Sequence, residues 1–150
     1  MKKLSALLLA TMATLITIPA SAQFAKPDDA IKYRKNALFV MQQNFSRVAG
    51  MAAGKVPFDA KVAAESASVA EFVGKLPWAA FGPDTDMGDS KAKVEIWSNK
   101  AKFDDYANKM QVELAKLSAA AKAGNLDGIK QAVNAAGGTC KSCHDDFRAK

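Results

Sequence analysis

Apolar residues recur every three or four positions in four successive segments of this chain. That spacing places them on one face of an α-helix, whereas a half-buried β-strand alternates apolar and polar residues. No alternating segment of useful length occurs, β-branched runs are few, and helix-forming Ala, Lys and Leu are abundant. The pattern predicts an all-α fold.

The first two segments are bounded by clear start and stop residues. Proline at position 27, followed by Asp28 and Asp29, is a typical helix start, and Gly54 with Pro57 ends that helix. The buried face predicted for the first helix is Ile31, Arg34, Leu38, Met41, Phe45, Val48 and Ala52. A second helix is expected from Asp59 to Lys75, with Val62, Ser66, Val69, Val73 and Leu76 as its buried face.

The last two segments follow each other closely. The third helix is expected to begin after Ser98 or Asn99 and to end at Gly124. Its apolar stripe is Phe103, Tyr106, Met110, Leu114, Leu117 and Ala121. The fourth helix begins after Asn125, and its stripe is Leu126, Ile129, Val133, Ala136, Cys140, Cys143 and Phe147. Short outer connections and one long central connection predict a single antiparallel four-helix bundle.

The long connection, residues 77–98, carries Trp78 and Phe81 between glycines and prolines. Long loops in small domains usually have a function. Two large aromatic residues in such a loop indicate packing against an apolar surface. That surface is either the end of the bundle core or a bound cofactor.

Residues 1–22 have the features of a secretory signal peptide. Lys2 and Lys3 precede a short apolar run, and Ala20-Ser21-Ala22 is a small-residue cleavage site. Cleavage after Ala22 would leave residues 23–150 as the mature domain, and the apolar run is short for a retained membrane anchor. The sequence therefore predicts export to the periplasm. No second run of membrane length follows.

The segment Cys140-Lys141-Ser142-Cys143-His144 contains both cysteines and the single histidine of the chain. Its C-x-x-C-H spacing is the attachment pattern of one covalent haem c. Two thiols bond the two haem vinyl groups, and the adjacent imidazole of His144 can coordinate the iron. A zinc site would need further Cys or His ligands. A dithiol redox motif normally accompanies a βαβ pattern, which this sequence lacks.

The charge of the chain argues against nucleic acid as a partner. The formal net charge of +6 falls by two to +4 when Lys2 and Lys3 leave with the signal peptide. Lysine and arginine do not cluster with interleaved aromatic residues, as they do in nucleic-acid-binding proteins. An unknown acidic redox partner is compatible with the mild positive charge.

Several stretches together resemble the class II cytochromes c, and most closely the cytochromes c′. They are Q-F-A-K-P at 23–27, Tyr33-Arg34, L-P-W-A-A-F-G-P at 76–83, E-I-W-S at 95–98 and the terminal C-K-x-C-H-x-x-[FY]-R. The similarity extends over essentially the whole mature chain. It implies a four-helix bundle with haem c near the C-terminus, and homodimers that pair through the first two helices.

The resemblance also implies roles for individual residues. His144 would be the only protein ligand of a five-coordinate, high-spin iron. Leu38 would close the opposite, distal face, and the resemblance places two more residues in that pocket, Trp78 and Phe81. The proximal side would hold Arg148. Arg34 carries a charge on a buried face, so it needs either an anionic partner or a side-chain conformation that reaches solvent. The resemblance implies that the partner is a haem propionate.

This arrangement predicts a periplasmic haem protein that binds NO and CO and can exchange electrons. Leucine offers no lone pair to iron, and no second histidine exists to act as a distal acid or base, so the chain is not expected to be an enzyme. The alternative is a low-spin electron carrier of the cytochrome c-556 type with methionine as sixth ligand. Met41 is the methionine one turn from Leu38 that could serve in that case.

Overall fold

The computed structural model describes residues 23–150, so the predicted signal peptide at 1–22 lies outside the described residues. The elements in chain order are α1 (Pro27–Ala52), α2 (Ala60–Val73), the 3-10 turn η2 (Pro77–Ala80), α3 (Glu95–Ser98), α4 (Lys100–Lys122) and α5 (Leu126–Phe147). Four long helices are present where the periodicity predicted them. The all-α prediction is confirmed.

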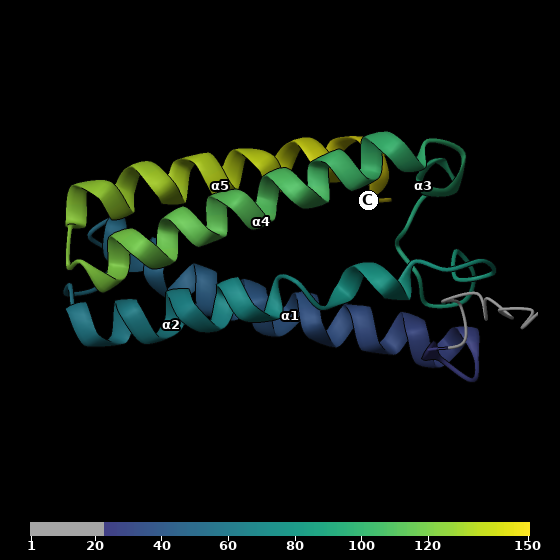
Figure 1. The fold of residues 1–150 in the computed structure, drawn as a ribbon, viewed down its shortest axis with the longest axis horizontal. Coiled ribbons are helices and arrows are strands. Elements are labelled where there is room, and N and C mark those ends of the chain that lie inside the picture. Colours follow the sequence, from purple (N-terminus) through teal and green to yellow (C-terminus); the bar gives the residue numbers. More distant parts are fainter. Residues whose placement is uncertain (1–22) are drawn as a thin grey trace, which may run out of the picture.

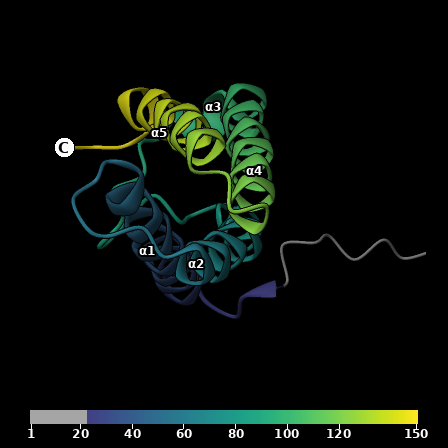
Figure 2. The ribbon, with the colours of Figure 1, turned by 90° about the vertical axis from the view of Figure 1, so that its left-hand side faces the viewer.

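The four long helices form an antiparallel bundle of two layers. Figure 1 shows α1 and α2 in one layer and α4 and α5 in the other, with the long connection and α3 at one end. Each helix packs against its neighbours in the ring: α1 against α2 and α5, and α4 against α2 and α5. The end-on view in Figure 2 shows this ring directly. The predicted bundle is therefore present, with its two short turns at one end and the long connection at the other.

Local sequence signals determine the two short turns. The carboxylate of Asp59 accepts a hydrogen bond from the Val62 amide at 3.0 Å at the start of α2. The side chain of Asn125 accepts from the Gly128 amide at 3.0 Å at the start of α5. Gly124, just after α4, has φ +64, which only glycine adopts without strain.

The buried face of α2 differs from the prediction. Val69 and Leu76 are 40% and 36% exposed, whereas the buried residues of the helix are Ala63, Ser66, Ala67 and Ala70. Small side chains on this face let α1 and α4 approach closely. At Gly74 a Cβ atom would lie 2.7 Å from Leu114 Cδ1. The prediction was correct for Ser66, and Val62 and Val73 pack against the core as partly buried residues. It was wrong for Val69 and Leu76, because it weighted hydrophobicity over size.

The connection between α2 and α4 is more regular than the sequence indicated. It contains η2 and α3, and the Trp97 indole donates to the carbonyl of Gly82 at 2.8 Å. Its middle pairs with the chain beyond α5 through an antiparallel bridge between Ala92 and Arg148. The Lys93 amide donates to Phe147 O at 3.0 Å. The connection therefore folds back onto the C-terminal end of α5.

None of the helices in residues 23–150 combines the length and the apolar character that crossing a membrane requires.

Candidate functional site

The two cysteines lie on the inward side of α5, three residues apart and therefore on one face of the helix. Cys140 packs against the main core, whose buried members include Met41, Leu114 and Ala136. Cys143 packs against a second core cluster formed by Ile96, Phe103 and Phe147. Both are free thiols and half-buried. The predicted stripe thus brings both thiols to the interior at the same end of the bundle.

The environment of the thiols does not suit dithiol redox chemistry. Burial raises the pKa of the Cys140 thiol. Burial also raises the pKa of Cys143 to about 11, with further contributions from Cys140 and Asp146. Catalytic dithiols instead have lowered pKa values, because the thiolate is the nucleophile. These two thiols are held in the neutral form at neutral pH.

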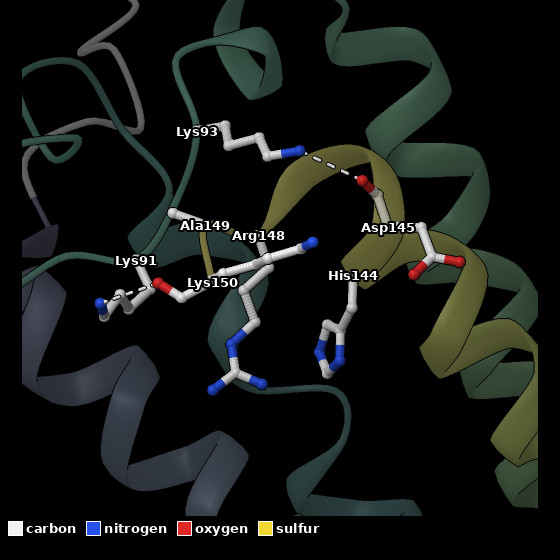
Figure 3. Close-up of a pocket in the computed structure, with 7 residues that line it drawn as sticks. All are labelled: Lys91, Lys93, His144, Asp145, Arg148, Ala149 and Lys150. Carbon is white, nitrogen blue, oxygen red and sulfur yellow. Dashed lines mark hydrogen bonds between the residues drawn. The ribbon is translucent and has the colours of Figure 1, made fainter.

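His144 and Arg148 face an open cavity of about 620 Å³ at the C-terminal end of α5. Figure 3 shows the imidazole and the guanidinium projecting to the same side, with Lys91, Lys93 and Lys150 also at the cavity. Desolvation of the imidazole lowers the pKa of His144, and the positive charge of Arg148 lowers it further. The neutral imidazole is the form that ligates metal ions.

Arg148 lies beside His144, as predicted, but it does so outside the helix rather than within it. Helical spacing places residues four apart on one face, but α5 ends at Phe147 and Arg148 has extended backbone angles, φ −115 and ψ 128. The bridge to Ala92 holds this backbone. The Lys93 ammonium also donates to the carbonyls of Asp145 and Asp146 at 3.1 Å each, which closes the end of the helix.

Trp78 and Phe81 pack into an aromatic cluster beside the cysteines. Their rings stack with centroids 6.1 Å apart, and the Phe81 ring contacts Phe103 edge-on at 4.8 Å. Phe103 in turn contacts Phe147 at 5.5 Å. Trp78 packs against both core clusters, and its indole donates to Gly74 O at 2.7 Å. Both aromatic residues therefore cap the bundle core at the end that holds Cys140 and Cys143.

Arg34 is buried, with 3% of its surface exposed, so the alternative that it reaches solvent is wrong. One guanidinium nitrogen donates to Ala80 O at 3.0 Å and to Thr85 Oγ1 at 2.7 Å. The other donates to Thr85 O and, at 2.7 Å, to Ser90 Oγ. The Phe81 ring lies 4.3 Å from the guanidinium carbon. Burial lowers the pKa of Arg34 to about 10.

These contacts give Arg34 a structural role that the sequence did not reveal. Its four terminal N–H groups have four acceptors in the long connection, which leaves Nε as its remaining donor. The predicted propionate contact stays a prediction.

Leu38 and Met41 occupy different environments on α1. Leu38 is half-buried and packs against the same core cluster as Trp78 and Cys140. Met41 is itself a member of that cluster, with 7% of its surface exposed. Leu38 is therefore the more exposed of the two side chains, and Met41 is part of the buried core.

The residues at this end of the bundle suit haem c. Cys140, Cys143 and His144 follow one another on α5, with the thiols turned inward and the imidazole at the cavity. Apolar side chains from α1 and η2 surround the thiols. Gly137 and Gly138, one turn before Cys140, lie within unbroken helix, and a Cβ atom at either position would meet nothing within 4 Å. The protein's own packing therefore does not require these two glycines.

Comparison with known proteins agrees with this geometry. The family model described as "Cytochrome C'" matches residues 29–148. The chain belongs to the cytochrome c′ family. Cytochrome c′ of Rubrivivax gelatinosus is 50% identical over 129 residues, which cover 85% of this chain and all of the relative. Cytochrome c′ of Alcaligenes xylosoxydans xylosoxydans is 45% identical over 128 residues, 85% of this chain and 99% of the relative.

Solved cytochrome c′ structures have the same fold. The crystal structure of the Rubrivivax gelatinosus protein has a TM-score of 0.81 and covers 84% of this chain and 99% of its own. The nitric oxide complex of a leucine-to-alanine variant from Alcaligenes xylosoxidans has a TM-score of 0.79 at 43% identity, covering 85% of this chain and 99% of its own. Proteins of the cytochrome c′ family carry haem c, which is the group that the C-x-x-C-H motif predicts.

The residues that sequence reasoning missed lie in the long connection. Lys91 and Lys93 border the cavity, and Thr85 with Ser90 accepts the hydrogen bonds of Arg34. The strand of an isolated bridge and the loop acceptors of a guanidinium have no periodic pattern, so no sequence signal distinguishes these residues from ordinary loop residues.

Proposed function

We propose that the mature domain, residues 23–150, is a periplasmic cytochrome c′ that holds one haem c through thioether bonds to Cys140 and Cys143. His144 serves as the axial ligand. The haem supplies an iron that takes up diatomic gases and changes between the ferrous and ferric states. The chain's residues hold this group, exclude competing ligands and determine which small molecules reach the iron.

The observation that carries the proposal is the leucine at position 38. Leu38 packs with Trp78 and Cys140 on one core cluster, and it has no atom that can coordinate iron. A side chain of this size at the distal face excludes large ligands and leaves room for NO and CO. The NO complexes solved for cytochrome c prime from Alcaligenes xylosoxidans support a gas-binding function. Electron exchange is a second expected property, because the same iron changes oxidation state.

The remaining residues have supporting roles in this proposal. Trp78 and Phe81 complete the apolar distal pocket, and Arg148 lies on the proximal side, where its charge favours neutral His144. Arg34 contributes its remaining donor to a haem propionate while it anchors the connection.

Two substitutions distinguish this proposal from the low-spin alternative. Leu38→Met places a thioether at the distal position and is expected to produce a six-coordinate, low-spin spectrum with weakened CO binding. Met41→Leu removes the other candidate ligand and is expected to leave the wild-type spectrum unchanged. If Met41→Leu instead converts a low-spin protein into a high-spin one, the electron-carrier alternative is correct.

We also propose that the protein is a homodimer that pairs through α1 and α2. Support comes from large apolar side chains exposed on these two packed helices, among them Phe39 at 61% and Phe72 at 66%. Phe72→Glu is expected to yield monomers in analytical ultracentrifugation. Val112→Glu, at a 53% exposed position on α4, is the matched control and should leave the dimer intact. A dimer that survives Phe72→Glu would contradict this interface.

A further inference from the structure

The cavity beside His144 has a positively charged rim. Its lining includes four cationic side chains, Lys91, Lys93, Arg148 and Lys150, which we call the basic rim. They come from two chain segments that the bridge between Ala92 and Arg148 holds side by side (Figure 3). Asp145 is the acidic residue in the lining, and its carboxylate is paired with Lys141. The cationic side chains of the rim therefore outnumber the acidic side chains in the lining.

The charges of the basic rim differ from those elsewhere in residues 23–150. Ion pairs with carboxylates involve eight lysines: Lys35, Lys75, Lys100, Lys102, Lys109, Lys116, Lys130 and Lys141. Within that range, no rim residue has an Asp or Glu carboxylate within 4.0 Å of its charged group. Lys91 and Lys93 donate to backbone oxygens instead, at 3.1–3.2 Å. The peptide carbonyls orient the Lys93 ammonium without cancelling its charge, whereas the oxygen of the last residue, Lys150, is part of a carboxylate and partly offsets the charge of Lys91.

We propose that the basic rim is the docking surface for an acidic redox protein that exchanges single electrons with the haem. The inference rests on the proposed function, because it takes His144 as the iron ligand. Four cationic side chains gathered at one opening, with Asp145 as the acidic side chain in the lining, create a local positive potential that attracts an acidic surface and speeds its association. A partner on this rim lies beside His144, so the electron has a short path. One electron leaves the ferrous iron and reduces the oxidised metal centre of the partner, and reduction of the ferric iron is the reverse.

The form of the rim favours a protein over a small anion. Lys91, Arg148 and Lys150 are exposed, and the cavity is open to solvent. A binding site for a small anion usually has buried hydrogen-bond donors that point to one position. The cationic side chains of the basic rim are instead spread around the opening of the cavity. An extended, exposed set of like charges matches the transient, electrostatic interfaces of electron-transfer pairs.

The test compares two double variants of the holoprotein that carry the same change in net charge. Lys91→Glu with Lys150→Glu reverses two exposed rim charges. Lys55→Glu with Lys122→Glu reverses two exposed charges at the opposite end of the bundle, beside the two short turns. The probe is oxidised plastocyanin, an acidic copper protein. One readout is the rate at which it oxidises the ferrous haem protein, and the other is the change in amide NMR shifts of the haem protein on binding.

In the wild type, plastocyanin is expected to shift amide signals of residues 91–93 and 148–150. The rim variant should oxidise on the order of ten-fold more slowly at low salt, and the difference should vanish at high salt. The control variant should change the rate by less than about two-fold. Equal slowing of both variants, or shifts confined to other surfaces, would overturn the proposal. The absorption spectrum of each variant, recorded before plastocyanin is added, shows whether haem is attached. A missing haem spectrum would contradict the proposed function, whereas a normal spectrum with unchanged oxidation rates would contradict only the docking surface.

Discussion

The two ends of the bundle are built in different ways. The end with the short turns is closed by residues that act within three or four positions of each other, namely the Asp59 and Asn125 caps and the glycines at 54 and 124. At the opposite end, which we call the site end, Arg34 contacts a threonine 51 residues away, and residues 91–93 pair with the chain after α5. The comparison teaches that local rules determine the scaffold, whereas long-range contacts assemble the site.

Removing both thiols is expected to have the largest effect on the site end. The double variant Cys140→Ser with Cys143→Ser should carry no covalent haem, because His144 alone releases the group when the protein unfolds. Mass spectrometry of the denatured protein measures this loss. Ser142→Ala, an exposed position between the cysteines, is the control and should retain the haem mass. Haem mass on the denatured double variant would show that attachment uses other residues.

Loss of the buried arginine tests whether long-range contacts stabilise the site end. Arg34→Leu removes every hydrogen bond to Ala80, Thr85 and Ser90 and leaves buried acceptors unpaired. We expect the free energy of unfolding to fall by about 3 kcal/mol, since hydrogen bonds to charged groups contribute roughly 1.5–3 kcal/mol each. Urea unfolding measures the change.

The control for that experiment is Arg47→Leu. Arg47 is exposed and makes one contact of 3.4 Å with Ser66, so its loss should cost less than about 0.5 kcal/mol. Arg34→Lys adds a sharper test, because lysine keeps the charge but lacks the planar fork of donors. If Arg34→Leu is as mild as Arg47→Leu, the connection is held by other contacts.

A change in a short turn is expected to have the smallest effect. Gly124→Ala places a side chain at φ +64, where a Cβ atom would meet nothing within 4 Å, so its cost is conformational only. We expect a loss of about 1 kcal/mol in unfolding free energy and an unchanged haem spectrum. A changed haem spectrum would mean that the short-turn end influences the site end, and it would contradict the view that the two ends are built independently.

Much of the scaffold could be predicted from the sequence, since apolar spacing and capping residues act locally. The four helices, their short turns and the stripe that carries Cys140 and Cys143 were predicted correctly. The buried face of α2 was predicted only in part, because close packing selected alanines over the larger Val69 and Leu76. Hydrophobicity alone does not report how near two helices approach.

The site end could be predicted only in part. The C-x-x-C-H motif identifies its attachment residues because that chemistry needs adjacent positions. The acceptors of Arg34 and the lysines at 91 and 93 are brought to the site by tertiary contacts that leave no local pattern. Arg148 was expected beside His144 by helical spacing, and it arrives there through a β-bridge.

The most direct test of the central claim is the absorption spectrum of the reduced holoprotein, recorded before and after addition of CO. An open distal position beside Leu38 predicts a broad, unsplit high-spin spectrum that shifts when CO binds. A sharp low-spin α-band that CO does not change would contradict the account, and it would indicate Met41 or another residue as a sixth ligand of the iron.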